Sequence, residues 1–124
     1  MPRRKLLLID DEDDIREVAS LTLETMSEFE VITASNGHAG LERARDDQPD
    51  AILLDVMMPG LDGVSTFLKL QESETTRSIP VIFMTAKVQA ADTKRLSDLG
   101  AKGIIAKPFN PMTLSDEVLQ LLNS

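Results

Sequence analysis

The chain contains no cysteine, tryptophan or tyrosine, and it has only four phenylalanines among its 124 residues. Without cysteine the protein cannot form disulfides, hold a metal through thiolates or use a thiol nucleophile. Long apolar runs are also missing: the run after the basic start, Leu6 to Ile9, ends at Asp10. That run is too short for export or for crossing a membrane. We therefore expect a cytoplasmic protein without redox chemistry.

Positive charge is scarce as well. Thirteen Lys and Arg stand against 21 Asp and Glu, which gives a formal net charge of −8. Such a surface repels nucleic acid and anionic membranes, so we expect direct binding to neither. An acidic balance is compatible with a protein partner or a bound cation. The length is that of one ordinary domain, so residues 1–124 are expected to form a single domain.

Five short apolar runs recur along the chain, and most of them lack the alternation of a half-exposed strand. Continuous runs of this length are typical of strands in a parallel sheet that helices cover on both faces. The runs are Leu6–Ile9, Val31–Ala34, Ala51–Leu54, Val81–Met84 and Gly103–Ala106.

The segments between these runs have helical character. Asp13 and Asp14 stand where a helix start favours negative charge, and Asn110 and Pro111 are expected to cap and begin the last helix. Residues 38–45 and 90–99 complete the set. This alternation of strands and helices predicts a doubly wound α/β domain with a parallel sheet. The apolar residues at helical spacing are Ile15, Val18, Ala19, Leu23 and Met26, then Val64, Phe67 and Leu68, and finally Leu114, Val118 and Leu121.

Polar residues follow four of the apolar runs. In an open parallel sheet the ligand site lies beyond the carboxyl ends of the strands, so these residues are expected to converge on one rim. They are Asp10-Asp11-Glu12 after the first run, Asp55 after the third, Thr85-Ala86-Lys87 after the fourth and Lys107-Pro108 after the fifth.

Three carboxylates about 5 Å apart would repel by roughly 3 kcal/mol per pair at an effective dielectric of about 20. A protonated carboxyl group or Lys107 can offset part of this repulsion, but a hard divalent cation such as Mg²⁺ suits an all-oxygen site better. A carboxylate nucleophile, a metal, a lysine and a hydroxyl are the parts that phosphoryl transfer needs. Asp55 is the best-placed nucleophile.

The chain resembles the receiver domain of two-component response regulators, of the stand-alone chemotaxis-regulator type. The resemblance implies a flavodoxin-like five-stranded parallel sheet of order 2-1-3-4-5 with five helices. It also implies a signalling switch that catalyses only its own phosphorylation and dephosphorylation. The matching segments are Asp10-Asp11, the block from Leu54 to Gly63, Thr85-Ala86 and Lys107-Pro108.

The same resemblance implies roles for individual residues. A sensor histidine kinase or a histidine phosphotransfer protein would donate a phosphoryl group to the chain, with Mg²⁺ or, in its place, Mn²⁺ as cofactor. It also implies a cis peptide between Lys107 and Pro108. Asp55 would accept the phosphoryl group, Asp10, Asp11, Asp55 and the Met57 backbone carbonyl would hold the metal, and Thr85 and Lys107 would contact the phosphoryl group.

One position departs from the family pattern. Many receivers carry Tyr or Phe three residues before the conserved lysine, and here that residue is Ile104. We therefore expect phosphorylation, but no coupling through a rotating aromatic ring at this position. Because no effector domain follows Ser124, we expect output to pass through a partner protein. The expected reader face is helix 4, strand 5 and helix 5, with Lys87, Arg95, Ile104 and Lys107.

Other functions fit less well. Asp11-Glu12-Asp13 matches an Asp-x-Asp phosphohydrolase pattern, but the chain lacks an inserted substrate-binding cap. A pseudo-receiver, which keeps the fold without phosphorylation, is the main alternative, although all the chemical residues are present. An EF-hand would need Gly at Ile15, and a dinucleotide site would need glycines after the first strand. The single histidine, His38, is expected to be exposed and structural.

Overall fold

The computed structural model describes residues 4–26, 29–86 and 89–123. Within them, five strands and five helices alternate along the chain, as predicted. The strands are β1 (Arg4–Ile9), β2 (Phe29–Ala34), β3 (Ala51–Asp55), β4 (Val81–Thr85) and β5 (Gly103–Ala106). The helices are α1 (Asp13–Met26), α2 (Gly37–Asp47), α3 (Gly63–Glu72), α4 (Ala90–Leu99) and α5 (Leu114–Leu122).

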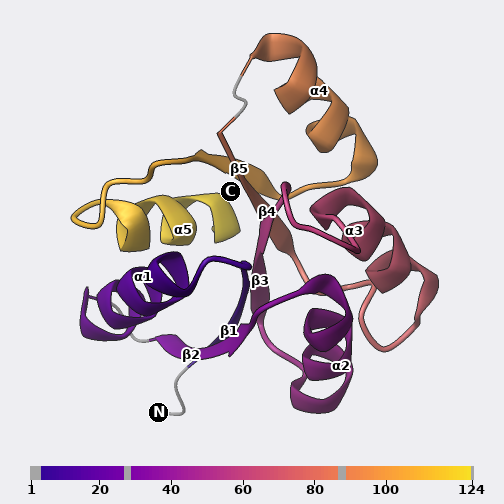
Figure 1. The fold of residues 1–124 in the computed structure, drawn as a ribbon, viewed down its shortest axis with the longest axis horizontal. Helices are drawn as coiled ribbons and strands as arrows, with labels where there is room; N and C mark the ends of the chain where they lie inside the picture. Colours follow the sequence, from indigo (N-terminus) through magenta and orange to yellow (C-terminus); the bar gives the residue numbers. More distant parts are fainter. Residues whose placement is uncertain (1–3, 27–28, 87–88, 124) are drawn as a thin grey trace.

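The strands form one parallel sheet in the order β2-β1-β3-β4-β5, which confirms the predicted topology. Helices α1 and α5 cover one face, and α2, α3 and α4 lie on the other side (Figure 1). The direction of winding reverses between β1 and β3. In a sheet of this kind, ligands bind beside the carboxyl ends of the two strands at such a reversal.

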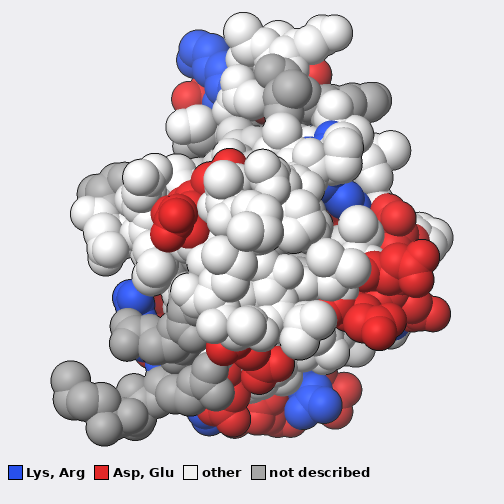
Figure 2. Space-filling view, turned by 90° about the vertical axis from the view of Figure 1, so that its left-hand side faces the viewer, with Lys and Arg blue, Asp and Glu red and all other residues white. Residues whose placement is uncertain are grey.

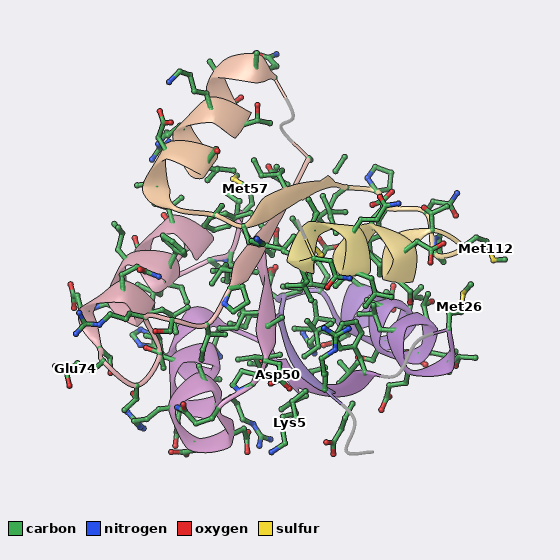
Figure 3. The ribbon with its side chains drawn as sticks, turned by 180° about the vertical axis from the view of Figure 1, so that it is seen from behind. Lys5, Met26, Asp50, Met57, Glu74 and Met112 are labelled. Carbon is green, nitrogen blue, oxygen red and sulfur yellow. The ribbon has the colours of Figure 1, made fainter. Side chains whose placement is uncertain are left out.

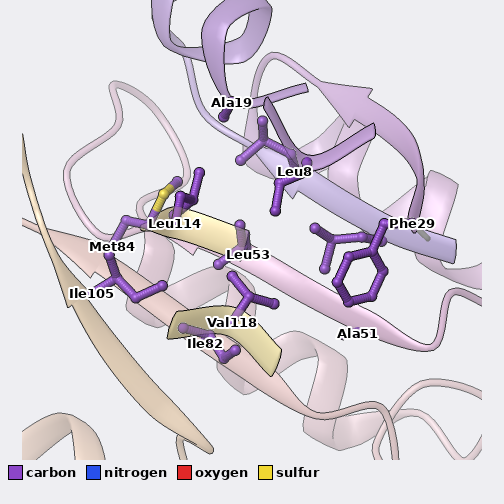
Figure 4. Close-up of a cluster of buried hydrophobic side chains, with 12 residues drawn as sticks. Leu8, Ala19, Phe29, Ala51, Leu53, Ile82, Met84, Ile105, Leu114 and Val118 are labelled. Carbon is purple, nitrogen blue, oxygen red and sulfur yellow. The ribbon is translucent and has the colours of Figure 1, made fainter. Parts of the chain in front are cut away.

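The sheet is buried on both faces, which explains its continuous apolar runs. Alternate residues of β1 point to opposite faces: Leu6 and Leu8 pack towards α1 and α5, and Leu7 and Ile9 pack towards α2 and α3. Figure 4 shows the first of these clusters, in which Leu8 lies among side chains from the strands and from the two helices. The apolar packing thus fixes both layers of helices against the sheet.

The helices bury a narrower face than their sequence pattern suggested. In α1 Ala19 and Leu23 are fully buried, whereas Val18 is 42% exposed and Met26 is 48% exposed. In α3 Leu68 is likewise exposed, because the helix directs Phe67 and its neighbours Thr66 and Leu70 inwards. None of the described helices is both long and apolar enough to span a membrane.

The predicted start of the last helix is wrong by three residues. Helix α5 begins at Leu114 after Thr113, and residues 111–113 form a turn. The Asn110 side chain accepts a hydrogen bond from the Met112 amide at 2.9 Å, so it stabilises this turn instead of capping the helix. The Asn110 carbonyl then accepts from the Leu114 amide at 3.0 Å, which leads the chain into α5.

Candidate functional site

The register of the sheet brings the predicted polar residues to one edge. Ile9 pairs with Leu54, so the next residues, Asp10 and Asp55, leave β1 and β3 side by side. Thr85 pairs with Ala106 at the ends of β4 and β5, and its carbonyl accepts a hydrogen bond from the Lys107 amide at 2.9 Å. Residues far apart in sequence thereby meet at the carboxyl edge of the sheet.

Four carboxyl groups cluster at this edge. One oxygen from each of Asp10, Asp11, Glu12 and Asp55 lies within 4.8 Å of the others. Asp10 is fully buried and Asp55 is 2% exposed. Asp10 accepts a hydrogen bond from the Glu12 amide at 2.9 Å, and Asp55 accepts one from the Met57 amide at 3.3 Å. These backbone contacts orient the two buried carboxylates without neutralising them.

Lys107 supplies a positive charge to the cluster. Its Nζ atom lies 3.0 Å from Asp10, 3.3 Å from Glu12 and 3.4 Å from Asp55, and its side chain is only 12% exposed. Burial acts to lower the pKa of Lys107, but the hydrogen bond to Asp10 and the neighbouring carboxylates outweigh it and raise the pKa above its usual value. Lys107 therefore stays protonated, although one ammonium cannot balance four carboxylates.

The environment of the Asp55 carboxyl group raises its pKa. Burial and the charge of Asp10 raise its pKa from 3.8 to about 6, against the opposing effects of Lys107 and of the Met57 amide. An added cation at this position would favour the ionised form, which is the nucleophilic form of a carboxyl group.

The residues present fit a hard divalent cation. The Oδ2 atom of Asp55 is buried and forms an ion pair with Lys107 Nζ at 3.4 Å, but it accepts no hydrogen bond from the described residues. Carboxylate oxygens are the ligands that Mg²⁺ prefers, and this cluster offers a buried oxygen with unused bonding capacity. An open hollow of about 330 Å³ adjoins it and is lined by Glu12, Ile15, Asp55, Met57, Ala86, Lys107 and Pro108.

Two other predicted residues differ in their position relative to this hollow. Thr85 is buried at the end of β4, but it lines a neighbouring hollow that holds neither Asp55 nor Lys107. Met57 lines both hollows and is 61% exposed, and Figure 3 shows its side chain near the base of α4. Contact of Thr85 with a phosphoryl group and metal binding by the Met57 carbonyl stay predictions.

Glu12 was expected at this edge of the sheet but was not among the predicted metal ligands. The structure brings its carboxylate to Lys107 and into the acidic cluster, although it remains largely exposed. Its position directly after Asp10-Asp11 was the sequence feature that indicated its place in the acidic cluster. Arg16 was not predicted: its guanidinium donates to the Asp10 carbonyl at 2.7 Å and pairs with Asp13.

The expected reader face is described only in part. Arg95 is exposed on α4 and Ile104 is half-buried on β5, whereas Lys87 lies outside the described residues. Lys107 points into the acidic cluster, so it adds little charge to the surface. Figure 2 shows, on the side that carries α1 and α5, acidic groups gathered towards two edges around an uncharged centre.

Two smaller predictions are confirmed. The peptide bond between Lys107 and Pro108 is cis. His38 is exposed near the start of α2, as the sequence indicated.

The chain is similar in sequence to known proteins. The family model of the response regulator receiver domain matches residues 6–119. The alkaline phosphatase synthesis transcriptional regulatory protein PhoP of Bacillus subtilis is 36% identical over 119 residues, which cover 96% of this chain and 48% of PhoP. The transcriptional regulatory protein CseB of Streptomyces coelicolor is 38% identical over 94% of this chain and 48% of its own length. The chain thus spans about half the length of these relatives.

Solved structures show the same architecture. The chemotaxis response regulator CheY4 of Vibrio cholerae superposes with a TM-score of 0.89 at 29% identity, covering 96% of this chain and 98% of CheY4. A putative response regulator from Chloroflexus aurantiacus gives a TM-score of 0.88 at 30% identity, covering 98% and 99%. The fold, the clustered carboxylates and the family match agree, and this chain belongs to the response regulator receiver domains of two-component signalling.

Proposed function

We propose that the chain is a single receiver domain, residues 1–124, that accepts a phosphoryl group from a phosphohistidine onto Asp55 in a step that depends on Mg²⁺. The donor is a sensor histidine kinase or a histidine phosphotransfer protein. The Asp55 carboxylate attacks phosphorus, an O–P bond forms, and the P–N bond to the imidazole breaks. The protein acts as a cytoplasmic signalling switch.

The surrounding residues have separate tasks in this proposal. Asp10, Asp11, Asp55 and the Met57 carbonyl would hold Mg²⁺, which supplies charge neutralisation for the phosphoryl oxygens. The Lys107 ammonium, held beside Asp10 and Asp55, can donate to a phosphoryl oxygen, and the Thr85 hydroxyl can turn towards the same group. Phosphorylation replaces the single charge of Asp55 by a larger one, and Thr85 and Lys107 then respond to it.

One observation carries the proposal. Asp55 is a buried carboxylate beside three other carboxyl groups, and its Oδ2 atom forms an ion pair with the Lys107 ammonium at 3.4 Å but accepts no hydrogen bond from the described residues. A purely structural carboxylate at 2% exposure would be expected to have its oxygens satisfied. The pseudo-receiver alternative does not explain why such a group is kept, and the phosphohydrolase alternative lacks a substrate-binding cap.

Signalling would proceed through a protein reader on the face formed by α4, β5 and α5. A shallow hollow of about 420 Å³ on this face is lined by Ile104, Ile105, Ala106, Glu117, Gln120 and Leu121. The negative net charge is the reason to propose a protein reader without direct contact to nucleic acid or membrane.

The direct test is phosphorylation by acetyl phosphate, a small donor that needs no partner. The protein is incubated with and without Mg²⁺, quenched rapidly and measured by intact mass. We expect one added phosphoryl group in wild type with Mg²⁺, and none after chelation or in Asp55→Asn. The P–O bond to acetate breaks, and acetate leaves.

Asp62→Asn is the matched control. Asp62 follows Asp55 on the same loop but only caps α3, where its side chain accepts from the Ser65 amide at 2.8 Å. Asn caps a helix about as well as Asp, so this variant should take up the phosphoryl group like wild type. Absence of an adduct in folded wild-type protein would favour the pseudo-receiver.

A further inference from the structure

The connection between β1 and α1 carries three of the four clustered carboxyl groups. It runs from Asp10 to Glu12, after the end of β1 and before the start of α1 (Figure 1). The backbone of a connection is held less firmly than that of a helix or strand, because no regular set of hydrogen bonds runs along it. The contacts that do hold this backbone therefore determine where its carboxylates lie.

The two proposed metal ligands in this connection are held in different ways. The Asp10 side chain is fully buried, accepts a hydrogen bond from the Glu12 amide and pairs with Lys107 at 3.0 Å. The Asp11 side chain is only half-buried and makes no hydrogen bond or ion pair with the described residues. The position of the Asp11 carboxylate therefore depends on the backbone that carries it.

Arg16 holds the peptide group that joins Asp10 to Asp11. Its Nη1 atom donates to the Asp10 carbonyl oxygen at 2.7 Å, and this oxygen belongs to the peptide plane that leads to Asp11. Its Nη2 atom pairs with Asp13 in the first turn of α1. Hydrogen bonds from a charged donor are stronger than neutral ones, and the Arg16 side chain is only 19% exposed, so water competes little for them.

The packing of α1 directs Arg16 towards this peptide group. Arg16, Ala19 and Leu23 follow the spacing of one helix face, and Ala19 and Leu23 are fully buried against the sheet. Side chains on a helix lean towards its N-terminus, so Arg16 reaches back to the residues that precede α1. The orientation of the whole helix is thereby passed on to the short connection before it.

The charge of Arg16 and its hydrogen bond to Asp10 have opposite effects on cation binding. A guanidinium beside the acidic cluster repels a cation, so the loss of this charge alone would strengthen cation binding. The hydrogen bond orders the connection before a cation arrives, so the loss of this contact would weaken cation binding. The sign of the change on substitution therefore separates the two effects.

Resting on the proposed function, we propose that Arg16 is a positioning residue for the divalent-cation site. By holding the Asp10 carbonyl it fixes the peptide group between Asp10 and Asp11, and through it the Asp11 carboxylate, in the arrangement that binds Mg²⁺. Residues that orient metal ligands without touching the metal change its affinity by about 10–100-fold when they are removed.

Titration of the metal-free protein with Mg²⁺, followed by isothermal titration calorimetry without a phosphoryl donor, tests this proposal. Arg16→Met removes the donors and the charge at similar length, and it should weaken Mg²⁺ binding by about tenfold or more. Arg16→Lys retains a charged donor and should keep most of the affinity. Arg43→Met is the matched control, since Arg43 also forms an ion pair on a helix, with Asp47 of α2 at 3.4 Å, and it should bind Mg²⁺ like wild type.

A merely structural role of Arg16 would give a different result. Urea denaturation with chelator present would then show a less stable Arg16→Met protein, whose folded form still binds Mg²⁺ with the affinity of wild type. Unchanged affinity would overturn the inference, and so would tighter binding, which would leave only the effect of charge. Arg16→Gln, which keeps a polar side chain, serves for the same measurement if Arg16→Met does not fold.

Failure of this inference can be told from failure of the proposed function. Wild-type protein that binds Mg²⁺ and takes up the phosphoryl group, together with an Arg16→Met protein of equal Mg²⁺ affinity, would overturn the positioning role alone. Wild-type protein that binds no Mg²⁺ would overturn both proposals.

Discussion

Leu53 and Asp55 lie two residues apart on β3 and are both buried, yet burial has opposite consequences for them. Leu53 is fully buried in the cluster between the sheet and helices α1 and α5 (Figure 4), where apolar burial stabilises the fold. Asp55 buries a carboxylate beside that of Asp10, which costs free energy. The comparison separates the residues that hold the sheet together from those that give its edge a chemical task.

The largest effect is expected inside the sheet. Leu53→Ala should lower the free energy of unfolding by about 2–5 kcal/mol, because it removes buried methyl groups and leaves a cavity. Urea denaturation followed by circular dichroism measures this loss. Leu21→Ala, at a position that is 67% exposed, is the control and should change stability by no more than about 0.5 kcal/mol. Equal losses in both variants would remove the distinction between core and surface.

At the carboxyl edge of the sheet, we expect a substitution to increase stability. Asp55→Asn should raise the free energy of unfolding, whereas Leu53→Ala lowers it. The pKa of Asp55 is raised from 3.8 to about 6, so the folded state binds this proton more tightly than the unfolded state does. The ionised carboxylate then destabilises the fold above about pH 6, and the cost disappears below about pH 4. With about 1.4 kcal/mol per pKa unit, Asp55→Asn should stabilise the metal-free protein at neutral pH by something on the order of 3 kcal/mol.

Urea denaturation of wild type and Asp55→Asn at neutral pH and near pH 4, with chelator present, checks this prediction. The difference between the two proteins should shrink towards zero at the lower pH. Asp62→Asn again provides the comparison, since its carboxylate is exposed and its stability should follow that of wild type. A destabilised Asp55→Asn at neutral pH would contradict the assignment of a costly buried charge.

Binding of Mg²⁺ should offset the free-energy cost of burying the ionised Asp55 carboxylate. A ligand that binds only the folded state stabilises it by about 2.7 kcal/mol at a concentration 100 times its Kd. We therefore expect the melting temperature of wild type to rise with Mg²⁺ and to return on chelation. Asp11→Asn should lose most of the rise, because it removes one of the proposed ligands without changing size. A full rise in Asp11→Asn would exclude Asp11 as a ligand.

The smallest effect is expected for Glu12. Its ion pair with Lys107 is 3.3 Å long, but its side chain is 59% exposed, and exposed pairs contribute about 0–1 kcal/mol. Glu12→Gln should therefore reduce stability slightly at low salt and not at all at high salt, as measured by urea denaturation at both ionic strengths. A loss that persists at high salt would mean that Glu12 belongs with the buried members of the cluster.

The sequence pattern predicted a parallel sheet covered on both faces and the edge where the site lies, for physical reasons, whereas the strand order followed from the family resemblance. Strands buried on both faces leave continuous apolar runs, and parallel strands bring their carboxyl ends to one edge, so the approach of Asp10, Asp55 and Lys107 followed from their positions. Details that depend on side-chain packing did not follow. The pattern of α1 could not show that Val18 stays exposed, and Asn110 could cap either a turn or a helix.

Residue roles were predictable to different degrees. The closeness of Asp11 to Asp10 and Asp55 was foreseen, whereas the contact of Arg16 with the Asp10 carbonyl depends on how α1 is oriented over β1. The separation of Thr85 from the hollow of Asp55 and Lys107 is also a matter of three-dimensional packing. Neither feature leaves a periodic signal in the sequence.

The contact between Lys107 and Asp10 joins residues 97 positions apart. Such a contact forms only after the intervening strands have assembled, since closing so long a loop is costly until other contacts hold its ends together. A partly folded chain therefore has its carboxylates but not their lysine. Phosphorylation of Asp55, as proposed, would therefore require a completely folded domain. Nascent or damaged copies of the protein would not be phosphorylated.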